Sequence, residues 1–152
     1  MEDQIARDVV IAAPVERVWD LVTTAEHLGT WFGDDGADID LRPGGALVLR
    51  WKEHSTVHGR VETVEPHSRF SFHWLTGGCD TPAADEPADG TSTLVEFTLA
   101  PEGDGTRLTV VESGFSTLAL SPAAREERFA SHTGGWAFEL GELADHGARV
   151  AA

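Results

Sequence analysis

With 152 residues, of which 41% are hydrophobic, the chain can form one folded domain with a buried core, which excludes an intrinsically disordered protein. Its 26 acidic residues against 11 Lys and Arg give a formal net charge of -15, which argues against nucleic acid or an anionic membrane surface as a partner, because both attract positive charge. No apolar run approaches the roughly 18 residues of a membrane span, the N-terminus is acidic rather than signal-like, and the single Cys79 cannot form an internal disulfide, so we expect a cytoplasmic protein.

The N-terminal part of the chain predicts a strand followed by two helices. Residues 4–11, QIARDVVI, end in a β-branched run that predicts the first strand, and Pro14 suits the first position of a helix. Apolar residues then recur at the spacing of one helix face: Val15, Val18, Trp19 and Val22. The same spacing in Leu28, Trp31 and Phe32 predicts a second short helix, which the glycines of GDDG (residues 33–36) end.

Between residues 46 and 115 the pattern changes to that of strands. Five segments are rich in β-branched and aromatic residues: 46–53, 56–65, 69–75, 92–100 and 106–115. Short turn sequences between most of them favour an antiparallel meander. Residues 76–91 hold two prolines and four acids without a strand pattern, so we expect a mobile, solvated loop between two strands.

The last long element has a helical period with two adjacent stripes. Large residues form one stripe, with Thr133 among them: Phe129, Thr133, Trp136, Leu140 and Leu143. Small residues form the other: Gly134, Ala137, Gly141, Ala144 and Ala148. Each mid-helix glycine costs about 0.5–1 kcal/mol relative to alanine, so the small stripe calls for a tertiary reason. Either it lets the helix approach a sheet closely, or it leaves space for a ligand.

Five segments in this order are similar to the START-like, or SRPBCC, superfamily: Val9–Phe32, Gly44–Gly45, Gly59–Trp74, Gly105–Phe115 and Gly134–Leu143. Within it the chain resembles the branch named after the activator of the heat-shock-protein ATPase, often grouped with polyketide cyclase-like proteins. The resemblance implies one α+β helix-grip domain over residues 1–152. In that fold a curved antiparallel sheet of about seven strands wraps a long C-terminal helix, and two short helices follow the first strand.

Members of this superfamily commonly enclose a cavity between sheet and helix, and they include lipid and hormone binders, cyclases, oxygenase subunits and co-chaperones. Because fold does not determine function, we rank the alternatives on the residues. We expect a non-catalytic binder of a small hydrophobic or aromatic molecule. The expected ligand-binding residues are Trp31, Phe32, Trp51, Phe72, Trp74, Phe97, Val110, Glu112, Phe129, Trp136, Ala137, Leu140 and Gly141. We further expect Ala137 and Gly141 to face the inner surface of the sheet.

Glu112 is the weak candidate for catalysis. It shares a strand face with Leu108 and Val110, so we expect it in the concavity, where apolar surroundings would raise its pKa and suit a general acid or base. A cyclase- or hydrolase-type enzyme using this carboxylate is therefore one alternative. The opposing interpretation is a glutamate at a strand end that reaches solvent or pairs with Arg50 or Arg60.

No cofactor or metal is predicted. His54, His58 and His73 lack the convergent spacing of a zinc site and are interpreted as solvent-facing, and no phosphate-loop glycine pattern is present. A protein-interaction module related to chaperone ATPase activators is the other alternative. We rank a chaperone partner below a small molecule because the eukaryotic activator carries a separate N-terminal domain for which this chain has no room. A homodimer is plausible because closed dimers are common.

Overall fold

The computed structural model describes the chain except for residues 1–2, 34, 51, 53–55, 76–91 and 152. Within the described residues, seven strands form one antiparallel sheet in the order β1-β7-β6-β5-β4-β3-β2. Their bounds are β1 Gln4–Ile11, β2 Ala37–Ile39, β3 Ala46–Leu49, β4 Val57–Glu65, β5 Arg69–Leu75, β6 Ser92–Glu102 and β7 Gly105–Ser113. The first strand thus pairs with the last, which leaves β1 at one edge of the sheet and β2 at the other.

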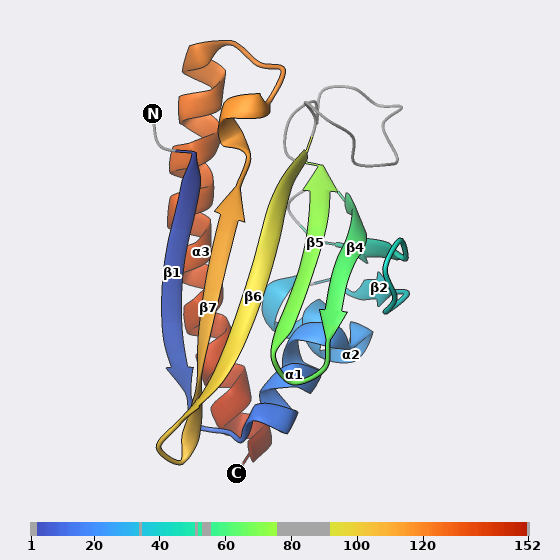
Figure 1. Ribbon diagram of the computed structural model, residues 1–152, viewed down its shortest axis with the longest axis vertical. Helices are drawn as coiled ribbons and strands as arrows, with labels where there is room; N and C mark the ends of the chain where they lie inside the picture. Colours follow the sequence, from blue (N-terminus) through green and yellow to red (C-terminus); the bar gives the residue numbers. More distant parts are fainter. Residues whose placement is uncertain (1–2, 34, 51, 53–55, 76–91, 152) are drawn as a thin grey trace.

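The helices gather on one side of this sheet (Figure 1). Two α-helices and a single π-turn connect β1 to β2: α1 Val15–Thr23, α2 Ala25–His27 and η1 Leu28–Phe32. After β7, a 3₁₀ turn η2 (Phe115–Thr117) leads into the long helix α3 (Pro122–Ala151), which runs along β1 and β7. Among the described helices, none is long and apolar enough to cross a membrane.

Alternation along β7 decides which side chains enter the core. Thr106, Leu108, Val110 and Glu112 are all at most 1% exposed, whereas the intervening residues are half-buried. Because successive strand side chains point to opposite faces, Glu112 must share the concave face with the apolar residues before it. The sheet register therefore brings a carboxylate under α3.

Aromatic rings fill much of the space between the sheet and α3. Phe32 lies 5.5 Å from Trp74 and 5.4 Å from Trp136, and the two tryptophan rings lie 5.9 Å apart, all between ring centroids. Phe97 adds an edge contact to Trp136 at 5.9 Å. Such rings contribute large buried areas and favour offset or edge-on contacts, so this part of the interior is a packed aromatic cluster.

The predicted α+β helix-grip class is confirmed, with differences in individual elements. The first strand matches residues 4–11, but β2 is absent from the sequence prediction because three residues are too short to show a period. The strand expected over 46–53 ends at Leu49, and the second helix is one short turn followed by the π-turn. The loop expected over residues 76–91, including Cys79, lies outside the described residues.

The prediction for the small stripe of α3 is wrong. Ala137 and Gly141 are exposed, and a Cβ added at Gly134, Gly135 or Gly141 would meet no atom within 4 Å. They do not face the inner surface of the sheet, because α3 turns Trp136, Leu140 and Leu143 toward it, and the small stripe lies roughly 100° round the helix from that face. No contact in the structure explains these three exposed glycines.

A different glycine makes the close approach. A Cβ on Gly147 would lie 2.6 Å from Cγ2 of Ile11 and 3.3 Å from Cδ1 of Leu21, and both of those side chains are fully buried. Gly147 continues the large stripe one turn beyond Leu143. It is the position at which the end of α3 packs against β1 and α1.

Candidate functional site

Glu112 is the centre of a buried polar cluster, which we call the Glu112 cluster: Glu112, Trp74, Thr93, His132 and Trp136. Its Oε1 accepts hydrogen bonds from Nε1 of Trp136 at 2.8 Å and Nδ1 of His132 at 2.8 Å. Its Oε2 accepts from Nε1 of Trp74 at 2.9 Å and from the hydroxyl of Thr93, and Nδ1 of His132 lies 2.9 Å away. Three strands and α3 therefore converge on one carboxylate.

The pKa of Glu112 is set by two opposed effects. Burial, the largest single influence, favours the neutral acid and raises the pKa, because the side chain is fully buried. Hydrogen bonds and charge attraction from His132, with the hydrogen bonds from Thr93 and Trp74, together outweigh burial and leave the pKa below its ordinary value. The carboxylate is therefore ionised at neutral pH.

This finding corrects one sequence-based expectation and confirms another. Glu112 does face the concavity, as its strand register predicts, and does not pair with Arg50 or Arg60. The expected rise in its pKa is wrong, because the site supplies indole, hydroxyl and imidazole donors rather than apolar groups alone. A fully buried carboxylate with every oxygen engaged is poorly placed to exchange protons with a ligand.

His132 is the member of the Glu112 cluster that reaches the surface. Its side chain is 20% exposed, and its ring stands edge-on to Trp74 and Phe115, with centroids 5.7 Å and 5.6 Å away. Within the described residues, no hydrogen bond is made by its Nε2. Glu112 thus fixes Nδ1 of His132, while the side chain as a whole remains partly exposed.

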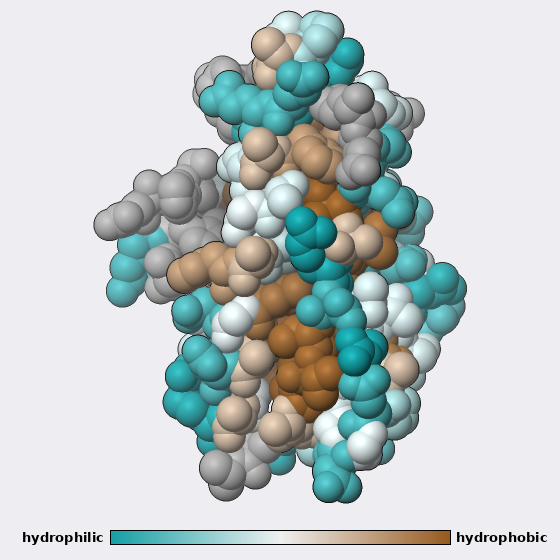
Figure 2. Space-filling model, turned by 90° about the vertical axis from the view of Figure 1, so that its left-hand side faces the viewer, coloured by the Kyte–Doolittle hydropathy of each residue, from teal (hydrophilic) through white to brown (hydrophobic). Residues whose placement is uncertain are grey.

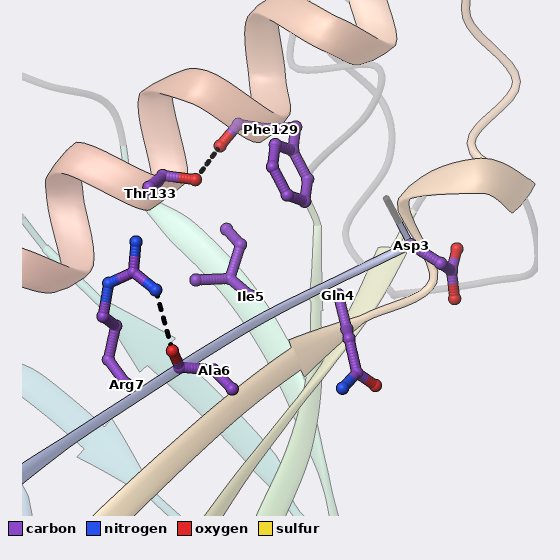
Figure 3. Close-up of a pocket in the computed structure, with 7 residues that line it drawn as sticks. All are labelled: Asp3, Gln4, Ile5, Ala6, Arg7, Phe129 and Thr133. Carbon is purple, nitrogen blue, oxygen red and sulfur yellow. Dashed lines mark hydrogen bonds between the residues drawn. The ribbon is translucent and has the colours of Figure 1, made fainter. Parts of the chain in front are cut away.

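A second feature is an open groove between β1 and α3, with a volume of about 460 Å³. Its lining residues are Asp3, Gln4, Ile5, Ala6, Arg7, Phe129 and Thr133. Figure 3 shows Ile5 pointing toward Phe129 and Thr133, which lie one helical turn apart on α3. Seen from this side, apolar side chains are exposed along a furrow through the molecule (Figure 2). We call this feature the β1–α3 groove.

The β1–α3 groove borders the Glu112 cluster but is distinct from it. Ile5, on its floor, pairs directly with Glu112 across β1 and β7. Thr133 follows His132 along α3, and Phe129 stacks edge-on against Phe115 at 5.2 Å. Neighbouring helix residues point about 100° apart, so His132 and Thr133 lie on the two flanks of α3, one on each side of its buried face.

Polar groups at the mouth of the β1–α3 groove differ in how far they are engaged. Asp3 accepts hydrogen bonds from the hydroxyl and then the backbone N–H of Ser116, which lower its pKa although partial burial opposes this. Arg7 donates to the carbonyl of Ala6 at 2.8 Å and makes no ion pair within the described part of the chain. Its guanidinium is therefore the charged donor available at the rim.

The structure divides the sequence-predicted ligand residues into four groups. The buried core holds most of them: Trp31, Phe32, Phe72, Trp74, Phe97, Val110, Glu112, Trp136 and Leu140. Among the sequence-predicted ligand residues, Phe129 is the one that lines the β1–α3 groove. Ala137 and Gly141 are exposed, and Trp51 lies outside the described residues. Ligand contact by any of them stays a prediction.

Sequence reasoning missed His132, Ile5 and Thr133 as site residues. His132 stands three residues after Phe129 and four before Trp136, which puts it beside the apolar stripe and was the available signal. Of the histidines that were considered, His58 and His73 are half-buried, and His73 pairs with Glu62 at 2.9 Å; His54 lies outside the described residues. No three described His, Cys, Asp or Glu side chains are grouped to hold a metal ion.

A family model described as Activator of Hsp90 ATPase homolog 1-like protein matches residues 12–147. The chain belongs to this family. The matched region begins directly after β1 and covers nearly all of α3, so it includes Glu112 and His132. A search of curated proteins gave no match for this AHSA1-like chain.

Several solved structures share this fold. DynU16, from the dynemicin biosynthetic locus, is 25% identical with a TM-score of 0.73; the match covers 96% of this chain but only 47% of DynU16. MLL2253 from Mesorhizobium loti is 22% identical with a TM-score of 0.75 and coverage of 93% and 94%. The Aha1 dimer from Colwellia psychrerythraea is 18% identical with a TM-score of 0.70 and coverage of 95% of each chain. At these identities the last two relatives establish the fold alone.

Proposed function

We propose that this AHSA1-like protein binds a small hydrophobic or aromatic molecule in the β1–α3 groove, between the sheet and the C-terminal helix. The observation that carries the proposal is the groove itself. Its volume of about 460 Å³ falls in the range of small-molecule sites, roughly 300–1,000 Å³. Ile5 and Phe129 offer an apolar floor, and Arg7 offers a donor for a polar end of the ligand.

The test uses the neutral fluorescent probe N-phenyl-1-naphthylamine, read by its emission and by the thermal stability of the protein. Binding to the native state stabilises it by RT ln(1 + [L]/Kd), which is about 2.7 kcal/mol at one hundred times Kd. Thr133→Trp fills the groove and should weaken probe affinity by about tenfold or more, equivalent to about 1.4 kcal/mol.

Ser131→Trp is the matched control, because Ser131 is exposed on the same helix outside the groove. It adds the same indole and should leave probe affinity unchanged. Equal loss of affinity in both variants, or no saturable binding to the unmodified protein, would remove the basis for the groove as the ligand site.

A protein-interaction role is the second candidate, favoured by the family match and by one surface feature. Phe138 is 64% exposed on α3, away from the buried stripe, and Val10 is 45% exposed on the edge strand β1. Phe138 is a large apolar side chain that a partner protein, whether a chaperone or a second copy of the chain, would remove from water. Light scattering and pulldown with an Hsp90 chaperone, each repeated with Phe138→Ser, test it. A monomer that captures no chaperone in either form would exclude this role.

A further inference from the structure

The hydrogen bonds of the Glu112 cluster determine the tautomer of His132. An ionised carboxylate can only accept hydrogen bonds, and Nδ1 of His132 lies 2.8 Å and 2.9 Å from its two oxygens. Nδ1 must therefore carry the proton. His132 can act as a base only in its neutral form, in which Nε2 carries a lone pair and accepts a proton.

The cluster also prepares His132 for a positive charge. When Nε2 gains a proton, the imidazolium lies against the Glu112 carboxylate, so the new charge is balanced within hydrogen-bonding distance. Trp74, Trp136 and Thr93 hold that carboxylate in place, and no rearrangement is needed as the charge forms. This is the arrangement of a base whose orientation is fixed by a buried acid.

The surroundings of Nε2 limit what could approach it. The described neighbours of the imidazole are Glu112 and the rings of Trp74 and Phe115, which would pack against a flat apolar body. An anionic molecule is disfavoured by Glu112 and by a net charge of -15. The indole N–H of Trp74 is engaged by Glu112, so these neighbours supply no donor for the localised oxyanion of ester hydrolysis.

We propose that His132, positioned by Glu112, is a general base that takes a proton from carbon in a neutral, conjugated carbonyl compound. The C–H bond breaks as the Nε2–H bond forms, and its electron pair moves to the carbonyl oxygen and the conjugated system. The imidazolium then returns the same proton to a different carbon, which yields an isomer. No oxidant, reductant or co-reactant is consumed. This activity goes beyond ligand binding in the β1–α3 groove and does not depend on it.

The test uses 5-nitro-1,2-benzisoxazole, a neutral flat carbon acid. Removal of its C3 proton by Nε2 turns the C–H electron pair into the third bond of a nitrile, and the N–O bond breaks to release a coloured phenolate. We expect the unmodified protein to accelerate this reaction about 100-fold over an equal concentration of free imidazole.

Variants separate the catalytic role of His132 from a structural one. His132→Gln should lower the rate to background, and His132→Gly should regain part of it when imidazole is added. Trp136→Phe keeps an aromatic side chain but removes one donor to Glu112, and should lower the rate without abolishing the reaction. His73→Gln is the matched control, because His73 is a more exposed histidine paired with Glu62. It should leave the rate unchanged.

Three outcomes would overturn the proposal: a rate no greater than that of free imidazole, an undiminished rate in folded His132→Gln, or an equal loss in His73→Gln. Two measurements on the unmodified protein separate the two proposals. If the unmodified protein accelerates the benzisoxazole reaction but does not bind N-phenyl-1-naphthylamine, the proposed function is wrong and the proposal of a catalytic base stands. If the naphthylamine binds and no catalysis is seen, the proposed function stands and the proposal of a catalytic base is wrong.

Discussion

Glu112 keeps a negative charge in a fully buried position, which costs several kcal/mol unless hydrogen bonds replace water. Two indoles, a hydroxyl and an imidazole supply that replacement. Removing the carboxylate would take away the acceptor shared by the indole of Trp136 and Nδ1 of His132. The stability of the fold and the orientation of His132 therefore depend on the same side chain.

The first prediction concerns Glu112→Gln. The amide keeps the shape but turns one acceptor into a donor that faces donors, so we expect a loss of about 3–5 kcal/mol in the free energy of unfolding. Denaturant titration measures it. Glu102→Gln, which weakens an exposed pair with Arg107, is the comparison and should cost at most about 1 kcal/mol. Similar losses in the two variants would contradict the assigned role of the buried carboxylate.

The second prediction concerns acid. The folded-state pKa of Glu112 lies below the ordinary value of 4.5, so its contribution to stability is complete above pH 4.5 and is lost as pH falls through the folded-state pKa. The stability difference between the unmodified protein and Glu112→Gln should narrow as pH falls below that point. A difference that stays constant down to the acid unfolding transition would mean that Glu112 is not ionised in the native state.

At the scale of elements, α3 has a buried face, two flanks and an exposed outer face that carries Phe138 and Gly141. Its buried face, with Trp136, Leu140 and Leu143, covers the sheet. One flank borders the β1–α3 groove at Phe129 and Thr133. The opposite flank carries His132 near the start of the helix and His146 near its end.

Glycines on these surfaces should respond oppositely to alanine, which is the third prediction. Gly141→Ala should stabilise the protein by up to about 1 kcal/mol through helix propensity, because its Cβ meets nothing within 4 Å. Gly147→Ala should destabilise it by about 1–3 kcal/mol, because its Cβ would clash with buried Ile11. Denaturant midpoints for both variants are the measurement, and a reversed order would show that α3 is turned differently against β1.

The fourth prediction concerns His146, whose Nε2 lies 2.8 Å from Nδ1 of His27 in α2. Burial, and then His27 and Arg149, lower its pKa below 6.5, while Glu26 opposes them. A lowered pKa means that the unfolded chain binds the proton more readily, so stability should be complete above pH 6.5 and decline below it. His146→Gln should flatten thermal stability between pH 7 and 5.5. An unchanged slope in that variant would assign the effect to other groups.

The spacing of apolar residues predicted most of the fold, because strands and the long helix have different apolar periods that can be read from the sequence. The rotation of α3 about its own axis was harder to predict, because the sequence shows two adjacent stripes and does not tell which one faces the sheet. Packing of Trp136 decided this, and the small stripe became exposed. His132 was not predicted as a site residue. A histidine at the edge of an apolar stripe is a site residue here only because it contacts Glu112, twenty residues away on β7.

At the scale of the whole molecule, the pairing of β1 with β7 shapes both proposed sites. It places Glu112 between Ile5 of β1 and Val95 of β6, beneath the first half of α3. It also makes β1 an edge strand beside α3, and the β1–α3 groove opens between the two. The apolar surface exposed there is what a bound ligand would remove from water.

Mapping a bound probe over the whole molecule by NMR tests the central claim most directly. Titration of ¹⁵N-labelled protein with N-phenyl-1-naphthylamine should shift amide signals concentrated along the β1–α3 groove, at Ile5, Ala6, Phe129 and Thr133, with a common saturation curve. Saturable shifts centred instead on the outer face of α3 around Phe138, or shifts that grow without saturation across the surface, would contradict a ligand site between the sheet and the helix.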